Sequence, residues 1–219
     1  MQRTAGNDFY NLGKRLIDIS GGFVGIILFS IPMFLTAVWI KLVSPDGPVF
    51  ADIPERIGRN GKKFKMYKFR SMIPNAAQFL RENPDLYAKY VANNYKLNAN
   101  EDPRIIKGGE FIRKFSIDEI PQFLNILKGD MSMVGPRAYY PFEIDEQKQR
   151  FPESIPYINE LIKVKPGITG VWQVGGRSKI GFLERVKMDA DYASKRSLVY
   201  DLLIILKTPY VVLTKKGAL

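Results

Sequence analysis

The sequence predicts a helix-dominated α/β fold, in which a proline-broken re-entrant membrane helix precedes a small cytoplasmic domain with amphipathic interfacial helices. Three observations support this prediction. An uncharged apolar stretch runs from Ile19 to Ile40, and about 20 apolar residues are enough for a membrane element. Helical periodicity dominates the rest of the chain, whereas strand-like segments are short. The last stretch, Leu198 to Leu213, has one apolar side and precedes Lys215 and Lys216, a pattern that fits an interfacial helix or a helix packed on the domain.

The membrane element is expected at residues 14–43, and Pro32 is its main irregularity, because proline removes a backbone donor and kinks a helix. Lys14 and Arg15 precede the apolar stretch and Lys41 follows it. Positive charge stays on the cytoplasmic side of a membrane. Two positive ends therefore favour a re-entrant helix that enters and leaves by one face. An ordinary span with a tolerated proline stays open on these residues alone.

The domain is expected at residues 44–219, after a linker rich in Pro, Gly, Ser and Asp at Ser44 to Pro48. The polar start, Met1 to Asn11, lacks the charged region and small-residue cleavage site of a signal peptide. The apolar stretch is also longer than a signal-peptide core. We therefore expect the apolar segment to be retained.

The composition narrows the available chemistry. The 219 residues include no histidine and no cysteine, which excludes Ser-His-Asp catalysis, a histidine base and a cysteine nucleophile. Catalysis would depend on carboxylates, Lys, Arg, Tyr, Ser or Thr, with Mg²⁺ or Mn²⁺ as suitable oxygen-liganded metals. The formal charge of +11 indicates a phosphate-bearing partner. Nucleic acid is the least favoured partner, since no binding-module signature is present.

The first half of the domain contains a predicted hairpin and two helices. Short strands are expected at Val49–Phe50 and Phe64–Phe69, around the Asn-Gly turn signal of Gly58–Gly61. Residues Ala76 to Tyr95 have helical periodicity, and Pro84 should divide them into two helices.

The second half contains more helices and one short strand. A strong helical pattern covers Phe111 to Leu127, with Gly129 as the residue after the helix end. A strand is expected at Met131–Val134 and a loop from Lys165 to Arg177. Helices are expected at Glu143–Arg150, Ile155–Ile162 and Phe182–Ser194. A final helix is expected at Leu198–Leu213, with Pro209 as a breaker.

The first cluster with chemical potential is Lys65 to Met72. Strand alternation would place Lys68 and Arg70 on the same face. Two neighbouring cations repel each other unless an anion lies between them, so the pair is consistent with a phosphate ligand. A solvated strand face is the alternative.

The second cluster is Arg113 to Pro121, which contains the adjacent carboxylates Asp118 and Glu119. Ser116 and Glu119 match a capping box. Pro121, however, favours a helix that begins at or after Asp118, because proline is tolerated only in the first turn. The carboxylates would then lie at a phosphate-binding helix start, where a carboxylate is expected to have a lowered pKa. Adjacent helical residues point about 100° apart, so one carboxylate could attack while the other holds a metal.

Two further segments end in arginine. The first, Gly129 to Arg137, offers a guanidinium that can bind phosphate through two parallel hydrogen bonds. The second, Lys165 to Arg177, is a glycine-rich loop with Trp172 and Gln173, which could hold a base or a sugar.

Together these motifs resemble the monotopic phosphoglycosyl transferases, a family of bacterial sugar transferases. The resemblance covers nearly the whole chain from Lys14. The motifs that carry it are Lys68-Phe69-Arg70-Ser71-Met72, Asp102-Pro103-Arg104, Asp118-Glu119-Ile120-Pro121-Gln122, Lys128-Gly129-Asp130-Met131-Ser132, Gly135-Pro136-Arg137 and Lys165-Pro166-Gly167-Ile168-Thr169-Gly170.

The resemblance implies an enzyme at the cytoplasmic face of the bacterial inner membrane, with a re-entrant helix. Asp118 matches a nucleophile that attacks the sugar-bearing phosphate of a UDP-sugar, forms a phosphosugar–aspartyl intermediate and releases UMP; undecaprenyl phosphate then accepts the phosphosugar. Glu119 matches the Mg²⁺ ligand of the catalytic pair. The resemblance also implies substrate-binding residues, of which the two phosphate-binding arginines are Arg113 and Arg137 and the others are Lys68, Arg70, Pro136, Gln173 and Arg177.

The sequence departs from the family pattern in places. Ile106 and Phe115 stand where threonine is usual. The long stretch Asn75 to Asn100, together with Trp172 and Gln173, resembles the hexose-1-phosphate transferases, with galactose as the first expected sugar and glucose as the second. Larger relatives carry a further N-terminal membrane bundle, and the sequence leaves open whether this chain is a short member or part of a longer protein. Homo-oligomerisation also stays open.

Two alternative functions are compatible with the sequence. One is the same transfer through a ternary complex without a covalent step. The other is a basic, membrane-anchored binding protein for acidic lipid or nucleic acid, with no enzymatic activity.

Overall fold

The computed structural model describes residues 5–51, 53–92, 97–98, 101–176 and 180–214. The chain divides into two compact units. The first unit comprises Met1–Leu28, Ile53–Met66 and Gln122–Leu219, and the second comprises Phe29–Asp52 and Tyr67–Pro121. Helices dominate both units, as the sequence predicts. The predicted boundary separates a membrane element at 14–43 from a domain at 44–219. Because it depends on the position of a bilayer, it stays a prediction.

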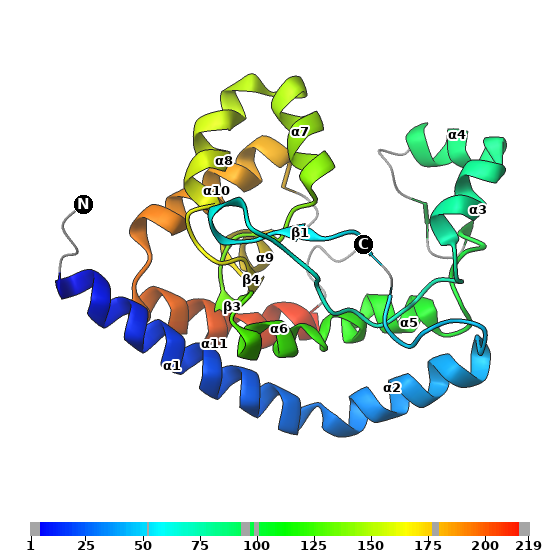
Figure 1. Cartoon of the computed structure of the whole chain (residues 1–219), viewed down its shortest axis with the longest axis horizontal. Helices are drawn as coiled ribbons and strands as arrows, with labels where there is room; N and C mark the ends of the chain where they lie inside the picture. Colours follow the sequence, from blue (N-terminus) through cyan, green and yellow to red (C-terminus); the bar gives the residue numbers. More distant parts are fainter. Residues whose placement is uncertain (1–4, 52, 93–96, 99–100, 177–179, 215–219) are drawn as a thin grey trace. The chain divides into compact units, whose positions relative to one another are not determined.

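The long helix α1 runs along one side of the first unit (Figure 1). Two two-stranded sheets accompany its helices: β1 pairs antiparallel with β2, and β3 pairs parallel with β4. The α-helices and strands among the described residues of this unit are α1 (Ala5–Leu28), β1 (Arg56–Ile57), β2 (Lys63–Phe64), α6 (Gln122–Lys128), β3 (Ser132–Val134), α7 (Pro141–Arg150), α8 (Ile155–Leu161), β4 (Gly167–Thr169), α9 (Val171–Gly175), α10 (Phe182–Lys195) and α11 (Leu198–Thr214).

Two apolar clusters among the described residues contribute to the packing of these elements. In the first, α8 packs against α10 (Figure 1), and the buried members are Tyr139, Ile144, Ile158, Leu161 and Val186. The second joins β3, α10 and α11 through Val134, Tyr192 and Ile204. Burial of each large side chain stabilises the fold by about 1.5–3 kcal/mol relative to exposure.

Helix α1 packs against α6 through a face that contains glycine residues. A Cβ atom at Gly22 would lie 2.8 Å from the side chain of Leu127, and one at Gly25 would lie 2.5 Å from the ring of Phe123. A side chain at either position would therefore separate α1 from α6. The close approach explains why glycine recurs inside an otherwise apolar helix.

The charged part of α1 is also bonded to other elements of the first unit. The Nζ atom of Lys14 lies 2.9 Å from Oδ2 of Asp201 and donates to the carbonyl of Val134 at 2.8 Å. Arg15 donates to the carbonyls of Ile126 and Leu127, which lack partners within α6 because they lie at its end. These cations, treated above as membrane-flanking charges, have structural roles within the protein.

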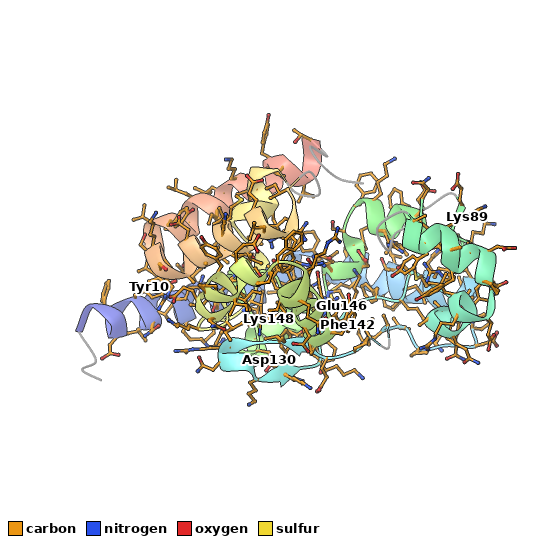
Figure 2. All side chains as sticks on the ribbon, turned by 90° about the horizontal axis from the view of Figure 1, so that it is seen from above. Tyr10, Lys89, Asp130, Phe142, Glu146 and Lys148 are labelled. Atoms are coloured by element: carbon orange, nitrogen blue, oxygen red, sulfur yellow. The ribbon has the colours of Figure 1, made fainter. Side chains whose placement is uncertain are left out.

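Two aromatic hydroxyls complete the surroundings of Asp201, which is fully buried. Tyr10, labelled on α1 in Figure 2, donates to its Oδ2 at 3.2 Å, and Tyr192 donates to its Oδ1 at 2.6 Å. The carboxylate is thus paired and hydrogen-bonded, as a buried charge must be.

The second unit contains four α-helices among its described residues: α2 (Ser30–Val43), α3 (Ala76–Glu82), α4 (Pro84–Ala92) and α5 (Gly109–Lys114). It also contains the 3₁₀ turn η3 (Ile117–Glu119). Its core comprises Ile40, Phe69, Ile106 and Ile112. The predicted division at Pro84 is confirmed by α3 and α4, and Figure 2 labels Lys89 on α4. Nothing is described for residues 93–96, the end of the predicted helical stretch.

The apolar stretch is divided at Phe29, between α1 and α2. No helix in the described chain is by itself long and apolar enough to cross a bilayer; Asp8–Leu28 and Ser30–Val43 meet that criterion only as a pair bent by 58°. The break precedes Pro32, which occupies the third position of α2. A proline ring clashes with the carbonyl four residues earlier, here that of Leu28, so the first helix ends there and Pro32 is accommodated in a first turn.

The Asn-Gly turn is confirmed, but the strands beside it differ from the prediction. Asn60 and Gly61 have φ values of 56° and 77° inside the 3₁₀ turn Arg59–Gly61, which joins β1 to β2. The predicted strand at Val49–Phe50 is reduced to a single bridge between Phe50 and Phe69.

Three further predictions are corrected. The pattern at 111–127 is not one helix but α5, η3 and α6, because Ser116 has a φ of 54° and Pro121 precedes α6. The predicted loop at 165–177 contains β4 and α9, since β4 finds a partner in β3. Pro209 does not break the last helix but lies inside α11. Gly129, by contrast, has the predicted role, with a φ of 89° directly after α6.

Candidate active site

The two adjacent carboxylates lie in the 3₁₀ turn η3 of the second unit. Ser116, with its left-handed backbone, starts the turn, and its side chain makes no capping hydrogen bond. The capping-box alternative is therefore wrong. The amide of Phe69 donates to the carbonyl of Asp118 at 2.9 Å, which ties the turn to the segment that carries Lys68.

Lys68 pairs with both carboxylates. Its Nζ atom lies 2.8 Å from Oδ2 of Asp118 and 3.6 Å from Oε1 of Glu119. The Asp118 side chain is only 4 % exposed, whereas that of Glu119 is 43 % exposed. The two acids thus have different surroundings: one is enclosed and held by a cation, and the other faces solvent.

Burial raises the pKa of Asp118, and the charge of Lys68 offsets part of that rise. The expectation of a lowered pKa is therefore wrong, because desolvation outweighs the neighbouring cations. For Lys68, burial acts to lower the pKa, but the charges of Glu119 and Asp118 raise it overall. Lys68 consequently remains a cation at neutral pH.

Arg70 and Lys68 have different partners in the structure. The Arg70 guanidinium is buried and donates to both the hydroxyl and the carbonyl of Ser44, and to the carbonyl of Pro48. Residues 65–68 are not in a regular strand, and Phe69 forms only a single bridge with Phe50. The shared face of Lys68 and Arg70 stays a prediction. Arg70 fixes the linker here, and its contact with substrate stays a prediction. Arg113 is exposed at the end of α5, close enough for its charge to lower the pKa of Asp118 in part.

The remaining described candidates, Pro136, Arg137 and Gln173, lie in the first unit. The Gly-Pro-Arg turn extends from β3, and the carbonyl of Pro136 accepts the amide of Gly167 at 2.9 Å. A Cβ atom at Gly135 would lie 2.3 Å from the carbonyl of Lys165. The glycines of these two motifs are therefore needed for the close approach of their backbones. Arg177 lies outside the described residues.

Sequence reasoning missed two polar residues beside Arg137, namely Arg185 and Asp189 on α10. Asp189 is fully buried and accepts the Arg137 amide at 3.1 Å. The sequence predicts this helix at Phe182–Ser194 but assigns no function to its side chains. The sequence did contain a signal, because Asp189 lies beside the apolar residues Val186 and Ala190 of this helix. An acidic residue on a buried helix face usually has a polar partner.

The residues that the structure describes do not by themselves provide a full set of metal ligands. Within the described ranges no group of three or more carboxylates is close enough to hold an ion. The exposed carboxylate of Glu119 nevertheless fits Mg²⁺, which is often bound by one or two carboxylates together with substrate phosphates and water.

Comparison with known proteins identifies the family. The profile of the bacterial sugar transferases matches residues 9–215. An uncharacterized sugar transferase of Haemophilus influenzae is 43% identical over 94% of this chain and 42% of its own length. The undecaprenyl-phosphate galactose phosphotransferase of Salmonella typhimurium is 38% identical over 94% of this chain and 41% of its own length. This chain thus spans about two fifths of those two relatives.

A third relative matches over most of its length. The exopolysaccharide production protein ExoY of Rhizobium meliloti is 37% identical, with 94% of this chain and 88% of the relative covered. The match therefore extends over nearly all of both chains. Together these similarities show that the chain belongs to the bacterial sugar transferase family.

Proposed function

We propose that this protein transfers a hexose-1-phosphate from a UDP-sugar to undecaprenyl phosphate, in the membrane step that starts polysaccharide synthesis. Family membership supports the reaction class. Galactose is the first candidate sugar, because the names of relatives at 38% and 39% identity include galactose. Glucose is the second candidate. The name of another relative includes N-acetylgalactosamine, so a UDP-sugar panel should contain that sugar too.

The observation that supports the chemistry is the enclosed Asp118 carboxylate beside Lys68. We propose that an Asp118 oxygen attacks the sugar-bearing phosphorus. The new O–P bond forms as the bond from that phosphorus to the bridging oxygen breaks, and UMP leaves with the electron pair. An oxygen of undecaprenyl phosphate then attacks the same phosphorus and releases Asp118 as a carboxylate. Neither step requires a histidine base, since both nucleophiles carry a negative charge.

The environment of Asp118 suits this role. A carboxylate with a raised pKa is more basic, and basicity accompanies nucleophilicity once the group is ionised. Lys68 keeps the carboxylate in place while Glu119 remains exposed toward solvent. Glu119 would hold Mg²⁺, which neutralises negative charge on phosphate oxygens when it is bound.

The experiment that tests this function is incubation with UDP-sugars in the absence of acceptor. The covalent route predicts one equivalent of UMP and a phosphosugar adduct on Asp118, detected by mass spectrometry of peptides. A ternary-complex enzyme would release UMP only after undecaprenyl phosphate is added. A non-enzymatic binding protein would release none under either condition, and that result would overturn the proposal.

We further propose that α1 and α2 form a re-entrant element on the cytoplasmic face of the bacterial inner membrane. The bent pair and its exposed apolar side chains support this proposal; Phe23, Ile27, Ile31, Phe34 and Leu35 are each at least 59% exposed. Large exposed apolar surfaces are costly in water. The apolar side chains Leu202, Leu203 and Leu206 on α11 are also exposed, as an interfacial helix requires.

Topology can be tested with tags at both ends of the chain. Both tags should be accessible only from the cytoplasm, and Pro32→Leu should increase the fraction with a periplasmic N-terminus by removing the constraint that ends α1. A matched Ile31→Leu variant should leave the distribution unchanged. A periplasmic N-terminal tag in the unmodified protein would establish a simple span instead.

Replacement of Lys68 by methionine should shift the pH dependence of transfer. Asp118 must be ionised to attack, so activity is lost as the pH falls through its folded-state pKa, which lies above the unperturbed 3.8. Lys68 lowers that pKa, and its removal raises it further. The acid limb of kcat should therefore move to higher pH in Lys68→Met. An unshifted acid limb would mean that the pair does not control the titrating group.

A further inference from the structure

The guanidinium of Arg137 is a half-buried cation without a side-chain hydrogen bond in the described part of the chain. It lies 5.8 Å from the ring of Trp172, and its Nε atom is buried and unpaired. Arg70 and Arg104, by comparison, each make several side-chain hydrogen bonds within the protein. An arginine held this way has donors left for a ligand.

A second guanidinium lies beside the same indole ring. Arg185, on α10, is 4.5 Å from the ring of Trp172 and donates to the carbonyl of Ile180 at 3.0 Å. Its Nε atom is also buried and unpaired among the described residues. Burial lowers the pKa of Arg185, and the nearby charge of Arg137 contributes in the same direction. Two like charges are thus held close to one aromatic side chain.

Asp189 lies near both cations, and it bonds the backbone of Arg137 without forming an ion pair with either guanidinium. It lies four residues after Arg185, on the same face of α10. Its Oδ2 atom accepts the backbone amide of Arg137 and, at 3.5 Å, the hydroxyl of Tyr139. Its Oδ1 atom is buried and has no partner in the described part of the chain.

The charge of Asp189 does not fully compensate the two guanidiniums. Within the described residues, no carboxylate oxygen lies within 4.0 Å of either group. Burial also raises the pKa of Asp189 to about 7, so the carboxyl is partly neutral at physiological pH. Two cations of this kind are stabilised when an anion binds both.

We propose that Arg185 acts together with Arg137 to bind the phosphate of a substrate, with Trp172 as the apolar side of the site. The inference rests on the proposed function, because both of its substrates carry phosphate. The diphosphate of the UDP-sugar and the phosphate monoester of the polyprenol share this chemistry. Arg137 was predicted as a phosphate ligand from its motif, whereas Arg185 follows from the structure alone.

The decisive variant is Arg185→Gln. Glutamine keeps a polar amide donor on a side chain of moderate length but carries no charge. Calorimetric titration of the full chain in detergent with UDP, and separately with undecaprenyl phosphate, identifies the source of the phosphate. The affinity for one of the two should fall about 10- to 100-fold, since a hydrogen bond to a charged group has that effect. Lys187→Gln on the same helix is the matched control and should bind both ligands as the unmodified protein does.

The outcome is informative in each direction. Affinities of Arg185→Gln within twofold of the unmodified protein for both ligands would overturn the proposal. Should that variant fail to fold, as judged by circular dichroism, Arg185→Lys is measured instead; it keeps the charge and loses the planar fork. A several-fold loss of affinity at an unchanged melting midpoint supports the proposal, and unchanged affinity overturns it.

Measurements of binding and of turnover distinguish a failure of this inference from a failure of the proposed function. A protein that binds UDP through Arg185 yet releases no UMP from any UDP-sugar would refute the proposed function only. A protein that transfers sugar phosphate while Arg185→Gln binds both ligands normally would refute this inference only. In a double-mutant cycle, Arg137→Gln and Arg185→Gln should be non-additive, because both contact one anion.

Discussion

Replacement of Asp118 by asparagine should reduce sugar-phosphate transfer by on the order of 10⁴-fold or more, a loss typical for removal of a catalytic nucleophile. The amide has nearly the same size as the carboxylate and can still contact Lys68, which lies 2.8 Å from the native oxygen. It lacks the anionic oxygen that would form the bond to phosphorus. Both UMP release and the adduct on this side chain should disappear together.

The control for this prediction is Asp102→Asn. Asp102 is also buried and is paired with Arg104 at 2.8 Å in the same unit. This change removes a comparable ion pair but does not alter the proposed nucleophile. It should lower the melting midpoint while UMP release stays measurable. Product accumulation at an undiminished rate in Asp118→Asn would contradict the proposed mechanism.

Replacement of Lys14 by methionine should destabilise the first unit by about 3–5 kcal/mol, because it leaves a buried carboxylate without its cation. Asp201 is fully buried, and Lys14 also donates to a carbonyl of β3. Tyr10 and Tyr192 would still donate to the carboxylate but cannot neutralise it. The melting midpoint in detergent should fall by about 6 °C or more.

Two further variants separate this effect from a general loss of charge. Lys195→Met removes an exposed ion pair on α10 and should change the midpoint little. Lys14→Met combined with Asp201→Leu should be less destabilising than the single lysine change, because no unpaired charge is then buried. An unchanged midpoint in Lys14→Met would show that the pair contributes nothing to the fold.

Local signals in the sequence were sufficient to predict several turns and helix ends. The turn at Asn60-Gly61, the division at Pro84 and the helix end at Gly129 were predicted correctly. Each depends on the backbone angles that one or two residues permit, which are independent of distant partners. The family also followed from motifs within short segments, and the comparison confirms it.

Pairings between distant segments were not predictable in the same way. The loop expected at 165–177 contains β4 because β3, more than thirty residues earlier, provides its partner. Lys68 pairs with the carboxylate of Asp118, whereas Arg70 donates to the linker carbonyls of Ser44 and Pro48. Neither partner is visible in the local pattern.

The sequence by itself determined the class of the protein, its proline-interrupted apolar stretch and the identity of its candidate nucleophile. Only the tertiary structure decided that Asp118 is enclosed and has a raised pKa, and that Arg185 joins Arg137 beside one indole ring. The physical reason is that motifs specify which groups are present, whereas burial and electrostatic neighbours arise when segments far apart in the chain pack together.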